Sequence, residues 1–179
     1  TGEETEHTHP ANTHTSSETP DTEDTESNAR NSGNRGIKKS DIIVSKLNQL
    51  GSKKLIGLYK SMYNVPLNTN PQLMFVGAWA FLEVLAKLAG NENDKGDRTQ
   101  EFPAFFRNKF REFGINKQNG KDCGLALDEI SRYGNATKHS RNCTPLTAVQ
   151  LENHFEVLEE LIRASIDKAL SLKQAKKAE

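Results

Sequence analysis

The fold of this chain is decided by residues 70–90, which read NPQLMFVGAWAFLEVLAKLAG. Asn70 can accept capping hydrogen bonds, and Pro71 is tolerated in the first turn of a helix. Between Leu73 and Leu88 apolar side chains occur nearly all round the helix rather than on one stripe, which is typical of a buried helix. We therefore predict a central, buried helix that ends at Gly90.

Two shorter amphipathic helices are predicted before the central one. Apolar residues at three- and four-residue intervals begin after Ser40 and stop at Gly51. Ser52 can cap the second helix, which Val65-Pro66 ends. The two apolar stripes are Ile43, Leu47 and Leu50, then Leu55, Leu58, Tyr59 and Met62. Each helix can thus bury one face.

A run of phenylalanines and basic residues follows a polar loop at 90–99. The phenylalanines are Phe102, Phe105, Phe106, Phe110 and Phe113, and the bases among them are Arg107, Lys109 and Arg111. Aromatic rings among cations can form a nucleotide-stacking surface, whereas a phenylalanine stripe at helical spacing can form core beside a solvated basic edge. We favour the core interpretation.

The next helix is predicted after a turn at 116–121, and it reaches His139 before Thr144-Pro145 breaks it. Its apolar residues are Leu125, Leu127 and Ile130. Gly134 in the interior of this helix costs about 1 kcal/mol relative to alanine. Either another helix or a phosphate approaches closely at Gly134, or the helix ends or kinks there.

A long last helix completes the domain, and Thr147 with Gln150 forms a capping box at its start. Its apolar stripe is Leu151, Phe155, Leu158, Leu161, Ile162, Ile166 and Leu170. No run of residues is typical of a strand. We therefore predict an all-α fold, an antiparallel bundle of about five or six helices.

Charge divides the 179 residues into two parts. Residues 1–36 contain eight acidic and two basic residues, leaving 16 acidic and 22 basic residues for 37–179. The first part, rich in Thr, Ser and Glu, is predicted to be a disordered acidic tail or linker, because it has almost nothing to bury. The second is predicted to be one folded, mildly basic domain. The absence of an initiating Met suggests an upstream domain in a longer protein.

Membrane insertion and a disulfide framework are not expected. Glu83 and Lys87 interrupt the longest apolar segment, and no signal-peptide pattern precedes it. The two cysteines, Cys123 and Cys143, are too few to cross-link a domain of this size. A reduced, cytoplasmic setting is therefore predicted.

The candidate functional residues are Arg132, Asn135 and His139. At about 100° per residue, the seven-residue interval from Arg132 to His139 closes to within about 20° of two full turns, with Asn135 about 60° to the side. An arginine can hold a phosphate by paired hydrogen bonds, and an imidazole titrates near neutrality and can transfer protons. The pattern is suited to phosphodiester chemistry.

Other histidines and cysteines are weaker candidates. His7, His9 and His14 have spacing that resembles a metal site, but solvated side chains in the tail are the simpler interpretation. Cys123, His139 and Cys143 match no familiar zinc pattern, so structural or free thiols are expected. His154 could face the helix that carries Arg132, or lie at the edge of the core. We therefore expect neither metal nor cofactor.

In residues 40–172 the order of these features resembles the HEPN superfamily, small helical bundles whose last-but-one long helix carries Arg, four to six residues, then His. Arg132, six residues and His139 match that spacing. Gly134-Asn135 and the polar break before a long last helix are similar to HEPN-like domains attached to bacterial restriction and ParB-type nuclease proteins. Tyr133 differs, since active members commonly have a polar side chain there.

The resemblance implies a homodimer in which the two motif helices form one composite cleft. In active members this cleft is a metal-independent ribonuclease site. By position, His139 would activate the ribose 2′-OH or protonate the leaving oxygen, Arg132 would steady the phosphate, and Asn135 would orient either one. Other members are inactive binding or dimerisation modules.

Two functions follow as hypotheses. The first is an RNA-cleaving domain of a prokaryotic defence or toxin-like protein, based on Arg132, Asn135, His139 and the basic fold. The second is a noncatalytic dimerisation or nucleic-acid-binding module that positions an upstream nuclease or DNA-reading domain, based on Tyr133 and the linker-like tail.

Overall fold

The computed structural model describes residues 36–139 and 147–178. Within these ranges six helices pack together and no strand is present. The helices are α1 (Asp41–Leu50), α2 (Lys53–Asn64), α3 (Pro71–Leu88), α4 (Phe102–Lys109), α5 (Lys117–His139) and α6 (Ala148–Ala178). The predicted all-α bundle of five or six helices is confirmed. The predicted tail, apart from Gly36, and the predicted break at Thr144-Pro145 lie outside the described residues.

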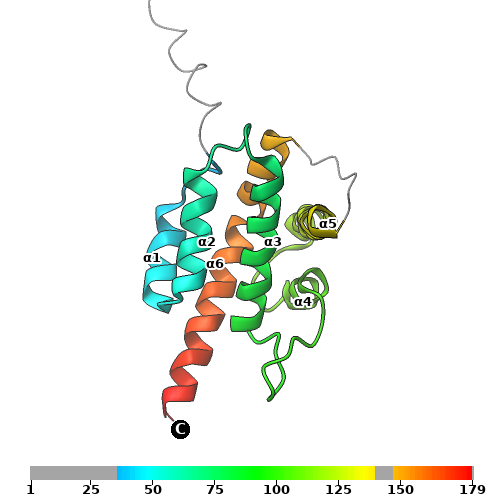
Figure 1. Cartoon of the computed structure of the whole chain (residues 1–179). Helices are drawn as coiled ribbons and strands as arrows, with labels where there is room; N and C mark the ends of the chain where they lie inside the picture. The colour runs from blue at the N-terminus through cyan, green and yellow to red at the C-terminus, as the bar shows by residue number, and fades with distance from the viewer. Residues whose placement is uncertain (1–35, 140–146, 179) are drawn as a thin grey trace, which may run out of the picture.

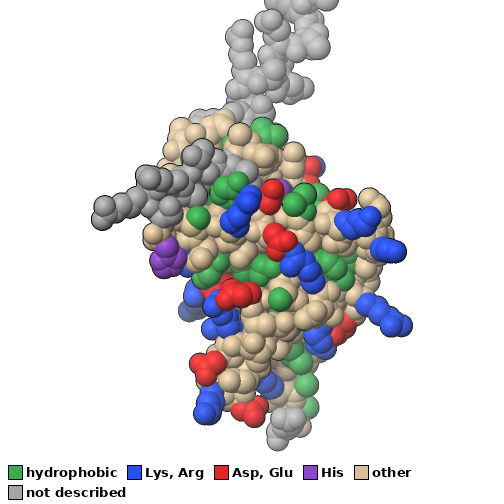
Figure 2. Space-filling model, turned by 90° about the vertical axis from the view of Figure 1, so that its right-hand side faces the viewer, with side chains coloured by type: hydrophobic (Ala, Val, Ile, Leu, Met, Phe, Trp, Pro, Cys, Tyr) green, Lys and Arg blue, Asp and Glu red, His purple; other side chains and the backbone are tan. Residues whose placement is uncertain are grey.

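Helix α3 is the centre of the molecule, as predicted from its sequence. It packs against α2, α4, α5 and α6, while α1 packs against α2 and α6. In Figure 1, α1, α2, α3 and α6 run lengthwise, and α4 and α5 are seen nearly end-on beside α3. Helices α4 and α5 therefore lie across one side of α3. This side of the molecule faces the viewer in Figure 2.

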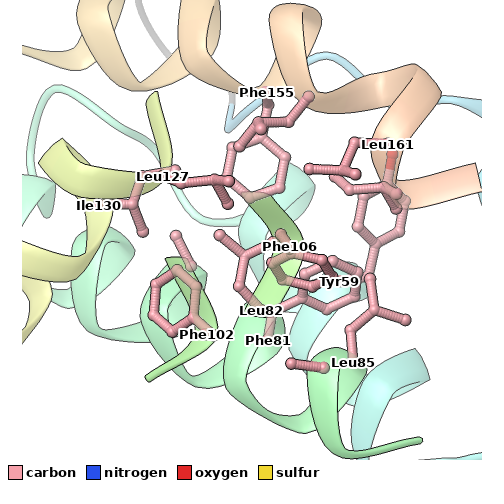
Figure 3. Packing of buried hydrophobic residues seen from close by; sticks show 14 of the residues in the cluster. Tyr59, Phe81, Leu82, Leu85, Phe102, Phe106, Leu127, Ile130, Phe155 and Leu161 are labelled. Atoms are coloured by element: carbon pink, nitrogen blue, oxygen red, sulfur yellow. The ribbon is translucent and has the colours of Figure 1, made fainter. Parts of the chain in front are cut away.

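The core gathers side chains from every layer around α3. Phe81, Leu82 and Leu85 of α3 are fully buried, and Figure 3 shows them meeting side chains from α2, α4, α5 and α6. The partners labelled there are Tyr59, Phe102, Phe106, Leu127, Ile130, Phe155 and Leu161. Phe102, Phe105, Phe106 and Phe113 are all buried, which confirms the core interpretation of the phenylalanine run. Phe110 is only partly buried.

Most predicted helix ends are confirmed by short-range hydrogen bonds. The hydroxyls of Ser40 and Ser52 accept from backbone N–H groups three residues on, and Gly51 ends α1 in a left-handed conformation with φ of 70°. In the capping box, Gln150 Oε1 accepts from Thr147 N at 2.9 Å and Thr147 Oγ1 accepts from Gln150 N at 3.3 Å. These signals are local, which is why the sequence predicts them.

The predicted start of α3 is confirmed in position, with Asn70 as N-cap residue and Pro71 first in the helix, but the Asn70 side chain makes no capping hydrogen bond. Its Nδ2 donates to the carbonyl of Pro66 at 3.4 Å. A second prediction, about the start of α5, is wrong. The segment 116–121 is not a turn: α5 begins at Lys117. The cause is Asn116, whose Oδ1 accepts hydrogen bonds from Gln118 N at 3.0 Å and Asn119 N at 2.9 Å.

Helix α3 is long and apolar enough to cross a membrane by length and composition alone, with a mean hydropathy of 1.3. No other helix in the described ranges meets that test. Its place among four other helices accounts for its apolar composition, because the central helix of a bundle is apolar nearly all round.

Candidate functional site on helix α5

Helix α5 is continuous from Lys117 to His139 and does not break at Gly134. Gly134 is buried where α3 crosses α5. A Cβ atom on Gly134 would lie 2.4 Å from Cβ of Trp79 and 2.9 Å from the carbonyl oxygen of Phe75. The glycine thus permits close approach of another helix, one of the two explanations that the sequence left open.

Continuity of α5 keeps Arg132, Asn135 and His139 on one exposed side of the helix. The residues buried on its other side are Cys123, Gly124, Ala126, Leu127, Ile130 and Gly134. Seven residues at about 1.5 Å each separate Arg132 from His139 by about 10 Å along the axis. Six exposed residues, at alternating four- and three-residue intervals, define what we call the outward face of α5: Lys121, Leu125, Asp128, Arg132, Asn135 and His139.

Leu125 belongs to this outward face and not to the core. It is one of the apolar residues that the sequence places on this helix, and it is 59% exposed. Leu127, two residues on, is fully buried. The two point in different directions because two helical steps turn the side chain by about 200°.

Arg132 is held by its neighbour Tyr133. Nη2 of Arg132 donates a hydrogen bond to the Tyr133 hydroxyl at 3.0 Å, and Cζ lies 4.6 Å from the centre of the ring. Tyr133 in turn packs its ring on Phe75, with 5.9 Å between ring centres. Tyr133 therefore orients the arginine. An arginine has five N–H donors, so the others remain for a phosphate.

His139 is the last residue of α5 and is exposed. The helix end beneath it is fixed by Lys138, whose Nζ lies 3.1 Å from the centre of the Trp79 ring. A cation on the face of an indole is attracted by the ring's charge distribution. Trp79 also covers Gly134, so one side chain of α3 sets the position of the C-terminal turns of α5.

His154 of α6 faces α5 but is not part of the outward face. Its buried Nε2 lies 2.7 Å from Oε2 of Glu129 and pairs with that carboxylate. Burial lowers the pKa of the imidazole, and the carboxylate of Glu129 opposes that shift. His154 therefore faces the motif helix and sits at the core edge, so both interpretations of this residue hold.

The zinc alternative at Cys123 and His139 has no geometric support. The two residues are 16 positions apart, about 24 Å along the axis, and Cys123 is buried while His139 is exposed. Cys123 donates to the carbonyl of Val157 at 3.4 Å, and burial raises its thiol pKa to about 11. Within residues 36–139 and 147–178, no three His, Cys, Asp or Glu residues form a metal site. Cys143 and the histidines of the tail lie outside the described residues.

Arg132, Asn135 and His139 are exposed, and they line none of the main hollows of the described residues. A hollow of about 960 Å³ lies between the ends of α3 and α6 and includes Leu88, Leu172 and Lys173. The candidate residues thus form an exposed surface on α5. Chemistry on that surface requires another molecule to cover it.

Sequence reasoning missed the basic residues at the start of α5. A groove of about 700 Å³ lies between α4 and this helix start, and it contains Arg111, Lys117 and Lys121. The signal was present in the spacing of Lys121, 11 residues before Arg132, which is close to three full turns. It was missed because 116–121 was interpreted as a turn.

Comparison of the chain with models of known protein families, with curated proteins and with solved structures found no match.

Proposed function

We propose that this chain is a HEPN-like domain that cleaves RNA without a metal ion, in a cytoplasmic defence or toxin-like protein of a prokaryote. The observation that carries the proposal is the continuity of α5 through Gly134. It keeps Arg132 and His139 two turns apart on one exposed face, with Asn135 beside them. This is the arrangement that the Arg and His motif requires.

The chemistry is transfer of the phosphoryl group from the 5′-oxygen of the next nucleotide to the ribose 2′-oxygen. The imidazole of His139 accepts the proton of the 2′-OH, and the 2′-oxygen attacks phosphorus as the bond to the 5′-oxygen breaks. The leaving oxygen takes a proton from the imidazolium of a second copy. Arg132 hydrogen-bonds the non-bridging oxygens, whose charge grows during the step. The products are a 2′,3′-cyclic phosphate and a 5′-hydroxyl.

A second copy of the chain supplies the cover that the outward face lacks. The midpoint between Arg132 and His139 falls beside Asn135. A two-fold axis through that point would place Arg132 of each copy against His139 of the other, since such interfaces pair a surface with itself. The resulting cleft would contain two arginines, two histidines and two amides.

The test is incubation of the purified chain with mixed RNA in EDTA, beside Arg132→Ala and His139→Ala variants. Loss of a general acid–base group is expected to slow cleavage by about 10²–10⁴-fold. Arg163→Ala and His14→Ala are matched controls that remove the same side chains elsewhere and should cleave as the wild type does. Cleavage that persists in pure His139→Ala protein with an unchanged helical spectrum would refute the mechanism.

One observation favours the second function, a noncatalytic module that dimerises and positions an upstream nuclease or DNA-reading domain. The guanidinium of Arg132 already donates to the hydroxyl of Tyr133 and lies over its ring. Tyr133→Phe removes the hydroxyl and keeps the ring. A dimer by light scattering that cleaves no RNA, as wild type or as Tyr133→Phe, would establish the module and exclude the nuclease.

A further inference from the structure

A basic groove lies beside the outward face of α5. It is formed where α4 and the chain after it meet the first turns of α5, and it is open to solvent. Its charged side chains are Arg107, Arg111, Lys117 and Lys121, and no acidic side chain lines it. We call this surface the α4–α5 groove.

Charge around the α4–α5 groove is almost entirely positive. Residues 107–121 contain five basic residues and one acidic residue, Glu112. Glu112 is paired with Lys109 and Lys168 at 2.7 Å each, and these lysines lower the pKa of its carboxyl group. The single acid is thus already neutralised by cations outside the groove.

The four cations of the groove differ in whether they already have a partner in the protein. Arg107 donates to the carbonyl of Gly124 at 3.1 Å and pairs with Asp128. Arg111, Lys117 and Lys121 are exposed and form no ion pair with any described residue. Three unpaired cations around a groove without acids attract a ligand that carries several negative charges.

The floor of the groove is apolar. Phe110 and Ile115 line it, and Phe110 is only partly buried although the other four phenylalanines of its run are buried. The absence of a side chain on Gly120 leaves the Phe110 ring accessible, since a Cβ there would lie 3.3 Å from its Cδ2. An aromatic ring beside cations is the combination that binds single-stranded nucleic acid, with bases on the ring and phosphates on the cations.

The groove continues into the outward face of α5. Lys121 belongs to both surfaces, and from there to His139 the helix extends about 27 Å. The other side of the α5 start is acidic, with Asp122, Glu156 and Glu160 around a hollow shared with α6. A polyanion on the outward face is therefore directed toward α4 and away from α6. Figure 2 shows basic side chains projecting from this side of the molecule, with acidic ones among them.

We propose that the α4–α5 groove binds the backbone of single-stranded RNA and leads it to Arg132 and His139. The inference rests on the proposed function for its choice of RNA, and it assigns the substrate class and the path. Arg111, Lys117 and Lys121 contact phosphates. Phe110 stacks with a base.

The test measures binding separately from cleavage. Fluorescence anisotropy is recorded in EDTA with a labelled single strand of about twelve nucleotides, long enough for a multi-nucleotide site. The strand carries 2′-O-methyl groups, which remove the attacking hydroxyl and prevent cleavage. The variant is Arg111→Gln/Lys117→Gln/Lys121→Gln. Its matched control is Lys53→Gln/Lys54→Gln/Lys60→Gln, which removes three exposed cations from α2.

The groove variant is expected to bind at least about tenfold more weakly. The slope of log affinity against log salt should become shallower by about 2, since each phosphate contact to a single strand contributes about 0.7. The control should match the wild type in both affinity and slope. Equal affinity and slope in the two triple variants would overturn the groove, and tighter binding of duplex DNA of the same length would overturn the assignment to single strands.

The two proposals fail in different ways. A wild-type chain that binds the methylated strand in the groove but leaves natural RNA intact supports the groove and refutes the nuclease. Conversely, wild-type cleavage that depends on His139 but is unaffected by the groove variant refutes the groove and leaves the nuclease standing.

Discussion

At the scale of single residues, Gly134 decides whether α5 is one helix or two. An alanine has better helix propensity by about 1 kcal/mol, so local preference alone disfavours glycine here. The Cβ of an alanine at this position would overlap Cβ of Trp79 and the carbonyl oxygen of Phe75. Both atoms are part of α3 itself, one in its backbone and the other directly attached to it. These atoms can move away only if α3 and α5 move apart.

Gly134→Ala is therefore expected to lower the free energy of unfolding by about 2 kcal/mol, since overpacking costs more than the helix gains. Urea denaturation followed by circular dichroism measures the change. Gly57→Ala in α2 is the control, because nothing lies within 4 Å of a Cβ there. That variant should gain up to about 1 kcal/mol. Equal stability of Gly134→Ala and the wild type would contradict the close helix contact.

At the scale of elements, α5 and α6 are joined by the pair of Glu129 and His154. Burial dominates the environment of the imidazole and lowers its pKa below the ordinary value of 6.5. The folded state therefore favours the neutral form. The unfolded chain binds the proton more readily, and stability depends on pH through that difference.

The sign of this dependence is fixed by the lowered pKa. The contribution of neutral His154 is fully present above pH 6.5 and is lost as pH falls from there through the folded-state pKa. We expect the free energy of unfolding to fall between pH 7 and 5 more steeply in the wild type than in His154→Gln. Urea denaturation at a series of pH values measures both slopes, and equal slopes would show that His154 does not titrate differently on folding.

The helix starts were predictable from the sequence where the hydrogen bonds that mark them join residues close together in the chain. Ser52 and the Thr147–Gln150 pair mark helix starts through bonds that span three residues. The start of α5 was missed although Asn116 is an equally local cap, because the glycine and polar residues that follow are typical of turns.

At the scale of the whole molecule, the candidate site could be predicted only in part. The shared face of Arg132 and His139 follows from helical period alone. The contact of Lys138 with Trp79 joins residues 59 positions apart, and the glycine that permits the helix crossing meets Phe75 and Trp79. Such long-range pairs depend on the angle at which α3 crosses α5. The periodicity of apolar residues in one sequence does not determine that crossing angle.

The proposed dimer makes a prediction at this scale. Leu125 is an apolar residue on the outward face and is 59% exposed. Leu125→Asp would put a charge where an apolar side chain meets the other copy, about 16 Å along α5 from the two-fold axis beside Asn135, so we expect a monomer that no longer cleaves RNA. Light scattering measures the mass, and circular dichroism checks the fold.

Ile42→Asp on α1 is the matched control, since Ile42 is 47% exposed and α1 makes no contact with α5. It should leave both the mass and the cleavage rate unchanged. A Leu125→Asp chain that stays dimeric would show that the dimer interface is not the outward face of α5.

Trp79 has one further consequence. It is the only tryptophan among the 179 residues, and its ring lies under the Lys138 ammonium against the glycine crossing. The intrinsic ultraviolet emission of the protein therefore originates almost wholly from the junction of α3 and α5. A spectrometer can follow events at the end of the motif helix in the unlabelled protein, because any ligand that displaces Lys138 alters the colour and yield of that single emitter.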